Sequence, residues 1–158
     1  MWQPPKAVSL VAGHGEGHTE LNAFDRALQD AGVADVNFLR VTSIMPPGAR
    51  VIDLPQYPAG LLTPAVYARI ASSRPGDRIA AAIGIGVCRE RYGVIMEHTA
   101  HAPGAEVDEA VRRMVEEGFR IRGLNVDEVL TAVAEHTVER AGCAVAVALF
   151  WPTPAGLA

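Results

Sequence analysis

Two apolar segments that are separated by only three charged residues constrain the fold of this chain most strongly. These segments are "RIAAAIGIGVC" (78–88) and "YGVIMEHTA" (92–100), and the polar connection between them is "RER". A connection this short is typical of a β-hairpin. We therefore expect the two segments to form neighbouring antiparallel strands, against which the other elements pack.

Three helices are expected beside these strands. The clearest runs from about Ala105 to Gly123, with Glu and Arg opposite an apolar stripe made of Val107, Ala110, Val111, Met114, Val115 and Phe119. Thr19 is a credible N-cap for an earlier helix that reaches about Gly32; the apolar face of that helix carries Leu21, Phe24 and Leu28. A third helix is expected near Thr63–Pro64, because proline is favoured in the first helical turn.

Strands outnumber helices in the sequence. The expected strands are 6–13, 35–43, 78–88, 92–100, 126–138 and 143–151. A glycine-rich loop, "HGEGH" (14–18), is expected after the first strand, and Arg74–Asp77 is expected to form a turn. The glycines of "GIGVC" (84–88) are expected to admit a close neighbour. These elements favour a layered α/β sandwich over a pure β-barrel.

The composition fits one compact domain. The chain has 158 residues, of which 49% are hydrophobic and 20% are charged, and this length suffices to bury a core without staples. The net charge of −4 and the single lysine, Lys6, give no basic surface for nucleic acid. The longest apolar run, "CAVAVALFW", is too short to span a bilayer. We expect 1–158 to be one soluble domain without a nucleic-acid or membrane partner, with a flexible tail at 152–158.

The cysteines and histidines do not form a recognisable site. Cys88 and Cys143 lie in apolar runs without a CxxC motif, so we expect reduced thiols in a cytoplasmic protein, with a disulfide between them as the alternative. The closest histidine pairs are His14 with His18 and His98 with His101. Neither pair belongs to a zinc-type motif, and we expect no bound metal.

The segment "VTSIMPPGA" (41–49) is chemically the least ordinary part of the sequence. It reads as the end of a buried strand, in which Thr42 and Ser43 place two adjacent hydroxyls ahead of the rigid stop at Pro46 and Pro47. A serine hydroxyl can attack the carbonyl carbon of its own preceding peptide bond and convert the amide to an ester. Local strain beside the two prolines would assist this step.

The further course of that reaction creates a new functional group. Loss of the serine α-proton eliminates the ester and leaves dehydroalanine, which water converts to a pyruvoyl group and ammonia. One product chain ends at Thr42, and the other begins with an electrophilic ketone made from Ser43. Such a ketone withdraws electrons from the α-carbon of a substrate amine, as a bound cofactor would. The dipeptide alone is not specific, because adjacent hydroxyls are common.

The sequence around the dipeptide resembles a known family. "VTSIMPPGARVIDLP" is similar to the self-cleavage segment of the pyruvoyl-dependent arginine decarboxylases, and the resemblance extends from about Val8 to Trp151. The other similar segments are "LNAFDRAL" (21–28), "DVNFLR" (35–40), "YGVIMEHTAH" (92–101), "EEGFRIRG" (116–123) and "EHTVERAGCAVAVALFW" (135–151). Thr42 and Ala34 depart from the family pattern, which usually has serine and glycine there, but neither change removes a required functional group.

The resemblance implies an architecture and an activity. The fold would be an αββα sandwich of the α/β (α+β) class, cut into a β chain (1–42) and an α chain (43–158). The molecules would assemble into homotrimers, or dimers of trimers, with active sites at subunit interfaces. The reaction would be the decarboxylation of L-arginine to agmatine and CO₂, with a covalent pyruvoyl group derived from Ser43 as cofactor.

Two further catalytic roles come from the resemblance. Glu97 matches the family's proton donor, which returns a proton to the substrate carbon after CO₂ has left. Strand alternation places Glu97 on one face with Ile95 and Thr99, and apolar surroundings there would favour the protonated carboxyl that a general acid needs. The alternative is an edge-strand glutamate that faces solvent. Asn37 corresponds to a family residue that positions the pyruvoyl group and the substrate.

Substrate contacts are expected from one carboxylate and three apolar residues. Asp25 falls on the apolar stripe of its helix, where a carboxylate requires a cationic partner. The guanidinium of the substrate fits that requirement, because arginine binds carboxylates through two parallel hydrogen bonds; a salt bridge to Arg26 or Arg40 is the structural alternative. The residues expected to line the aliphatic stem of the substrate are Leu28, Val36 and Ile44.

Other functions remain open from the residues themselves. A decarboxylase for another basic amino acid is one alternative, because a single aspartate does not distinguish arginine from a close analogue. An unprocessed homologue that only binds a cationic ligand is the second alternative, and the integrity of the chain distinguishes it. Agmatine made here could enter polyamine synthesis, or its production could consume acid, since decarboxylation takes up a proton.

Overall fold

The computed structural model of the chain describes residues 3–157. It contains the hairpin expected around "RER": β6 (Arg78–Val87) pairs antiparallel with β7 (Gly93–Ala100), and Ile83 lies opposite Glu97. Two more strands complete this sheet. In order across the sheet, they are β3 (Ile44–Met45), β7, β6 and β8 (Glu128–Thr137).

A second, five-stranded sheet packs against the first one. Its order is β2 (Asn37–Arg40), β5 (Leu62–Ser72), β9 (Gly142–Trp151), β1 (Ala7–Glu16) and β4 (Arg50–Val51). The core between the sheets draws on both: Val66 and Ala146 come from the five-stranded sheet, and Ile83 and Ile95 from the four-stranded sheet. All four side chains are almost fully buried.

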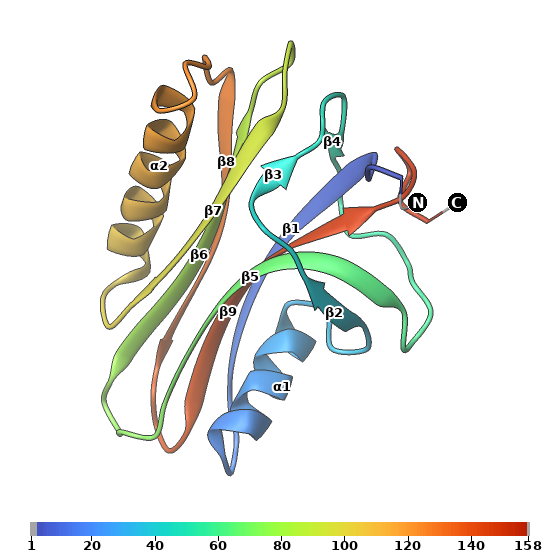
Figure 1. Cartoon of the computed structure of the whole chain (residues 1–158). Helices are drawn as coiled ribbons and strands as arrows, with labels where there is room; N and C mark the ends of the chain where they lie inside the picture. The colour runs from blue at the N-terminus through green and yellow to red at the C-terminus, as the bar shows by residue number, and fades with distance from the viewer. Residues whose placement is uncertain (1–2, 158) are drawn as a thin grey trace.

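One helix covers the outer face of each sheet, as Figure 1 shows. α1 (Glu20–Asp30) packs on β1 and β9, and α2 (Gly104–Arg120) packs on β6 and β7. The layers therefore run helix, sheet, sheet, helix. This arrangement confirms the αββα sandwich that the family resemblance implied, and no helix within residues 3–157 has the length and hydropathy to cross a bilayer.

The start of α1 and the buried face of α2 agree with the sequence prediction, whereas only Leu28 of the predicted α1 face is buried. Thr19 caps α1, because its Oγ1 accepts a hydrogen bond from the Asn22 N–H at 3.1 Å. The fully buried members of the predicted α2 stripe are Val107, Val111, Val115 and Phe119. Gly86 of β6 admits the Phe119 ring, since a Cβ at Gly86 would lie 2.2 Å from it.

The prediction of a third helix near Thr63–Pro64 is wrong. Residues 62–72 form β5, whose two faces are both apolar: Val66 and Ala68 face the core between the sheets, whereas Ala65 and Tyr67 face α1. An apolar run that is buried on both sides has no clear period, so the sequence does not separate strand from helix. Pro64 is tolerated because the pairing with β9 begins only at Ala65.

Two of the predicted strands also differ in length from the strands in the structure. The predicted glycine loop is mostly strand, because β1 continues to Glu16 and pairs with β9 up to Gly142. Gly13 serves close packing, since a Cβ there would lie 2.3 Å from the Ala27 carbonyl oxygen of α1. The strand predicted at 35–43 is only four residues long, Asn37–Arg40. Within residues 3–157 the structure has nine strands and two helices.

The two cysteines are free thiols. Cys143 is fully buried in β9, and desolvation raises the pKa of its thiol to about 11. A thiol that stays protonated at neutral pH is a poor nucleophile. The predicted flexibility of the tail stays a prediction; within it, Thr153 and Gly156 form an isolated bridge and Leu157 packs near the α1 core.

Candidate functional site

The Thr42–Ser43 peptide lies where the chain passes from one sheet to the other. β2 ends at Arg40 in the five-stranded sheet, and β3 begins at Ile44 in the four-stranded sheet. We call residues 41–43, which belong to neither strand, the crossover (Figure 1). The prediction that this segment ends a buried strand is therefore wrong.

Backbone hydrogen bonds hold both sides of the crossover. The Val41 N–H donates to the Ala65 carbonyl of β5 at 3.0 Å, and the Ile95 N–H of β7 donates to the Ser43 carbonyl at 2.8 Å. The peptide bond between Thr42 and Ser43 is thus placed between two anchors, one in each sheet.

The proline-rich segment confines the chain on the far side of β3. The Ala49 N–H donates to the Pro46 carbonyl at 3.1 Å, and Gly48 has a φ of 77°, a left-handed value that favours glycine. The turn returns the chain to the five-stranded sheet at β4. Ser43 therefore belongs to a short excursion into the four-stranded sheet that is fixed at both ends.

Glu97 lies on the strand that holds the crossover. It follows Ile95, the partner of Ser43, by two residues and shares its face of β7, which places it about 7 Å further along the strand. Its side chain is 32% exposed, so it is neither buried in the core nor freely solvated.

Arg40 is the cationic partner of Glu97. The Arg40 Nη2 lies 3.7 Å from the Glu97 Oε1, and it also donates a hydrogen bond of 3.3 Å to the Tyr67 carbonyl. The Arg40 guanidinium carbon is 4.6 Å from the centre of the Tyr67 ring, a cation–π contact. These side chains open onto a polar cleft of about 480 Å³, which is lined by Arg40, Tyr67, Ala68, Arg69, Glu97, His98 and Thr99.

An apolar cavity lies on another side of the crossover. It has a volume of about 500 Å³, and Val41, Thr42, Ile44 and Leu62 are among the residues that line it. Thr63 also lines this cavity; it is 1% exposed, and its hydroxyl oxygen has no hydrogen-bond partner within residues 3–157. Sequence analysis did not indicate this cavity, because a helix was expected to begin near Thr63–Pro64.

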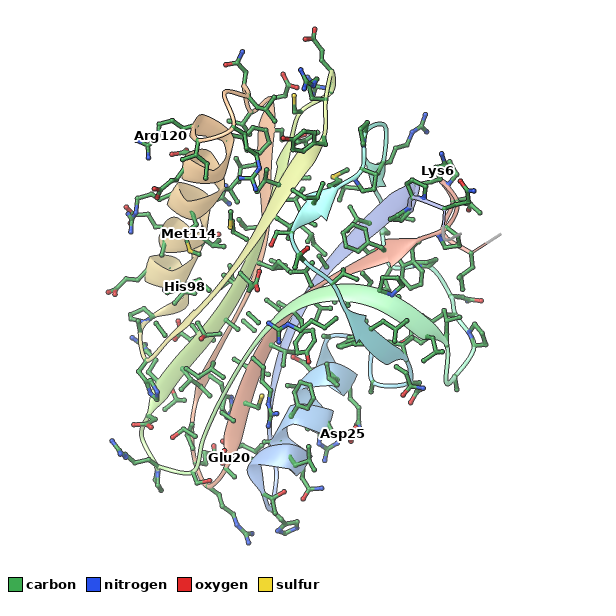
Figure 2. All side chains as sticks on the ribbon, viewed as in Figure 1. Lys6, Glu20, Asp25, His98, Met114 and Arg120 are labelled. Carbon is green, nitrogen blue, oxygen red and sulfur yellow. The ribbon has the colours of Figure 1, made fainter. Side chains whose placement is uncertain are left out.

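Apart from Ile44, the residues predicted to bind substrate lie elsewhere in the chain. Asp25 lies on α1 (Figure 2) and is exposed, and its carboxylate accepts a hydrogen bond of 2.9 Å from the Gln29 Nε2. The prediction that Asp25 falls on the buried face of α1 is wrong, because this helix packs through Ala23, Ala27 and Leu28 instead. No ion pair within residues 3–157 involves Asp25, so neither Arg26 nor Arg40 serves as its partner.

Leu28 and Val36 lie beneath α1, whereas Asn37 is exposed at the start of β2, on the opposite face of that strand from Phe38, which packs in the α1 core. The Asn37 Nδ2 donates to the Gly60 carbonyl at 3.2 Å, which ties the start of β2 to a turn. Leu28 and Val36 are each 9% exposed and belong to the core beneath α1.

Apart from Asn37, the predicted site residues thus fall into two groups within one chain. The crossover group consists of Thr42, Ser43, Ile44 and Glu97, and the α1 group consists of Asp25, Leu28 and Val36; Asn37, at the start of β2, belongs to neither group. Asn37 and Ser43 are six residues apart, which spans up to about 20 Å of extended chain. Within residues 3–157, backbone hydrogen bonds tie the crossover to β7, the strand that carries Glu97, and no hydrogen bond or ion pair joins the α1 group to the crossover group.

Arg40 and Tyr67 are the residues of this site that sequence reasoning missed. Arg40 entered only as a possible partner of Asp25, although its position three residues before Ser43 on a strand was a usable signal. Tyr67 was hidden because its segment was assigned to a helix.

The histidines do not form a metal centre in the described part of the chain, where no group of three or more suitable side chains occurs. His14 and His136 face each other with their Nδ1 atoms 2.9 Å apart, and the His136 Nε2 contacts the Glu16 carboxylate at 2.6 Å. Glu16 also accepts hydrogen bonds from the backbone N–H groups of Glu139, Arg140 and Ala141. This network joins β1 to β8 and to the β8–β9 turn.

Comparisons with known proteins give the same family as the sequence pattern. The family model described as pyruvoyl-dependent arginine decarboxylase matches residues 7–154. A protein of that name from Methanocaldococcus jannaschii is 45% identical over 149 residues, which cover 93% of this chain and 90% of the relative. Another from Thermococcus sibiricus is 41% identical over 155 residues, which cover 96% of this chain and 98% of the relative.

Proposed function

Because this chain belongs to the pyruvoyl-dependent arginine decarboxylase family, we propose that it converts L-arginine to agmatine and CO₂. The observation that carries this proposal is the crossover, which holds Ser43 between two sheets and beside the strand that carries Glu97. A serine in a fixed, irregular segment has the hydroxyl and the placement that self-cleavage requires.

The proposed cofactor is a pyruvoyl group made from Ser43 by cleavage of the Thr42–Ser43 bond. When present, this group supplies a ketone that withdraws the electrons released with CO₂. The Ser43 hydroxyl attacks the Thr42 carbonyl carbon, while the hydrogen bonds of Val41 and Ser43 keep the flanking backbone in place. The fit of these residues to the group is supported by the half-buried position of Ser43 and by its carbonyl bond to β7.

Cleavage leaves both pieces within one folded molecule. Residues 1–42 contain β1, α1 and β2, and residues 43–158 contain the remaining strands and α2. β1 pairs with β9 over ten residues, and β2 pairs with β5. These ladders hold the proposed β chain in the sheet after the peptide bond has broken.

Glu97 is assigned as the residue that returns a proton to the substrate α-carbon. A carboxyl that is partly withdrawn from solvent and adjacent to the crossover is well placed for this role. The proton leaves the Glu97 carboxyl oxygen and enters the new Cα–H bond, and the resulting carboxylate lies beside Arg40.

A second copy of the chain is proposed to complete the substrate site. Within residues 3–157 the Asp25 carboxylate has no cationic partner, which leaves it available for the substrate guanidinium. Since one chain keeps the α1 group apart from the crossover group, an assembly in which α1 of one subunit meets the crossover of the next would unite Asp25 with Ser43. We propose a homotrimer, or a dimer of trimers, for this assembly.

The remaining proposals concern roles at the edges of the site and the location of the protein. Asn37 positions the substrate, and Leu28, Val36 and Ile44 contact its aliphatic stem. A cytoplasmic location is proposed because both cysteines are free thiols.

Formation of agmatine by the Ser43→Ala variant tests this function. The wild-type protein should release CO₂ and agmatine from arginine, whereas Ser43→Ala, which lacks the attacking oxygen, should remain folded, uncut and inactive. Ser73→Ala is the matched control, because Ser73 is an exposed serine of the β5–β6 turn that bonds Glu20. Wild-type activity in Ser43→Ala would refute the cofactor assignment.

A further inference from the structure

Arg40 and Glu97 face each other across the polar cleft beside the crossover, and the two side chains are held very differently. Tyr67 holds the Arg40 guanidinium at two points, through its ring and through its carbonyl oxygen. The ring of Tyr67 is itself packed on Phe38 of β2, with ring centres 5.4 Å apart. The position of the Arg40 charge is therefore fixed without Glu97.

The contact between Arg40 and Glu97 is loose. Their closest atoms are 3.7 Å apart, beyond hydrogen-bond distance, and the two side chains are 60% and 32% exposed. An ion pair of this kind contributes little free energy. Another carboxylate can therefore replace Glu97 at Arg40 at small cost.

Arg40 is the cation in this cleft that faces Glu97. Arg69 of β5 also lines the cleft, but its guanidinium carbon lies 4.4 Å from the centre of the Phe24 ring of α1, and it forms no ion pair with Glu97 within residues 3–157. Ile83, the residue opposite Glu97 on β6, is apolar. His98, the neighbour of Glu97 on β7, also lines the cleft, although strand alternation directs it to the opposite face of β7.

We propose that Arg40 binds the α-carboxylate of the amino-acid substrate, in exchange for Glu97. This inference rests on the proposed function, since it assigns one more contact in the same reaction. A fixed guanidinium with free N–H groups is matched to a carboxylate, which it can bind through two hydrogen bonds. Arg40 thereby selects an α-amino acid over the corresponding amine.

The exchange keeps one carboxylate beside Arg40 at every stage. Before binding, this carboxylate is that of Glu97; with substrate bound, it is the substrate's, and Glu97 takes up a proton from solvent. When the bond to the carboxylate carbon breaks, CO₂ leaves as a neutral molecule, and the electron pair ends in a Cα–H bond with the proton from Glu97. Glu97 is then charged again and pairs with Arg40, while agmatine has no carboxylate to hold it there.

A comparison of arginine with its product, agmatine, distinguishes binding of the substrate carboxylate by Arg40 from a purely structural role of Arg40. Arg40→Met removes the charge and keeps the length of the side chain. It should raise the KM for arginine roughly 10- to 100-fold, the loss expected for a charge-assisted hydrogen bond. The inhibition constant of agmatine should change less than about twofold. Arg40→Lys should restore part of the affinity for arginine.

Arg78→Met provides the matched control, because Arg78 forms a comparable exposed ion pair, 3.1 Å from Glu135, on the far side of the four-stranded sheet. It should alter neither constant. An unchanged KM for arginine in Arg40→Met, or a parallel loss for arginine and agmatine, would overturn the assignment.

Calorimetry gives a readout that does not depend on turnover. In a Ser43→Ala background, Arg40→Met should weaken arginine binding by the same factor and leave agmatine binding unchanged. This comparison also decides the case if Arg40→Met prevents self-cleavage; equal effects on both ligands, or none, would refute the role of Arg40. A wild-type protein that makes no agmatine would instead refute the proposed function.

Discussion

The carboxyl group of Glu97 has to hold a proton at one stage of the proposed reaction and a negative charge at the next. Its side chain is 32% exposed, and the Arg40 guanidinium lies 3.7 Å from it. The intermediate placement beside the crossover is what makes Glu97 the candidate acid.

Glu97→Gln should separate turnover from self-cleavage. The amide keeps the shape of the side chain but cannot give up a proton as a carboxyl does. We expect normal cleavage of the Thr42–Ser43 bond and a kcat for arginine that falls roughly 10²- to 10⁴-fold, the usual contribution of a general acid. Intact-mass measurement and steady-state kinetics on the same preparation check both parts. Undiminished turnover would remove Glu97 from the mechanism.

At the scale of elements, the features that depend on neighbouring residues were predicted correctly from the sequence. The features that depend on contacts between distant segments were not. The Thr19 cap and the β6–β7 hairpin depend on neighbouring residues, so the sequence alone revealed them. The identity of β5 is determined by its partners β2 and β9, which are distant in sequence. The crossover was missed for the same reason, because a change of sheet at Val41 leaves no periodic signal.

The same distinction holds for the candidate site: features carried by short segments were predicted from the sequence, and features set by packing between distant segments were not. The chemistry of Ser43 and the match of Glu97 were visible as short segments, and the structure shows that β7 holds the crossover next to Glu97. The expected burial of Asp25 failed, because α1 packs through small alanines rather than through the Leu21 face, where Leu21 itself is 68% exposed.

The hydrogen bonds of Glu16, which join β1 to the β8–β9 turn, predict how the stability of the fold depends on pH. Burial opposes ionisation of Glu16, but the hydrogen bonds from Glu139, His136, Arg140 and Ala141 outweigh it and lower the pKa of this carboxyl below its ordinary value of 4.5. A lowered pKa in the folded state means that the charged group stabilises the fold above pH 4.5 and that this stabilisation is lost as the pH falls below it.

The Glu16→Gln variant should therefore be less stable than the wild type near pH 7 by about 1.5–3 kcal/mol, the range for hydrogen bonds to a charged group. The difference in unfolding free energy from wild type should shrink as the pH is lowered through 4.5 and below. Urea unfolding at a series of pH values checks this, with Glu139→Gln as the control for a simple change of charge in the turn. A difference that does not depend on pH would contradict the account.

At the scale of the whole molecule, the separation of the α1 group from the crossover group predicts that the site needs two chains. Asp25→Asn and Glu97→Gln should each be nearly inactive alone. When the two variants are unfolded, mixed and refolded together, some interfaces combine the intact Asp25 of one chain with the intact Glu97 of another. Random mixing in a symmetric assembly should restore about a quarter of the wild-type activity.

Refolding each variant by itself is the control for that experiment. Activity in the mixture that does not exceed the mean of the two separate preparations would contradict a shared site and would indicate that each chain completes its own.

The central claim is that the chain cuts itself between Thr42 and Ser43, and the mass of the purified protein under denaturing conditions tests it most directly. The account predicts two species, residues 1–42 with an ordinary carboxyl end and residues 43–158 beginning with a keto group that hydrazine or borohydride can trap. A single uncut polypeptide with no reactive carbonyl, from a preparation that still makes agmatine, would contradict it.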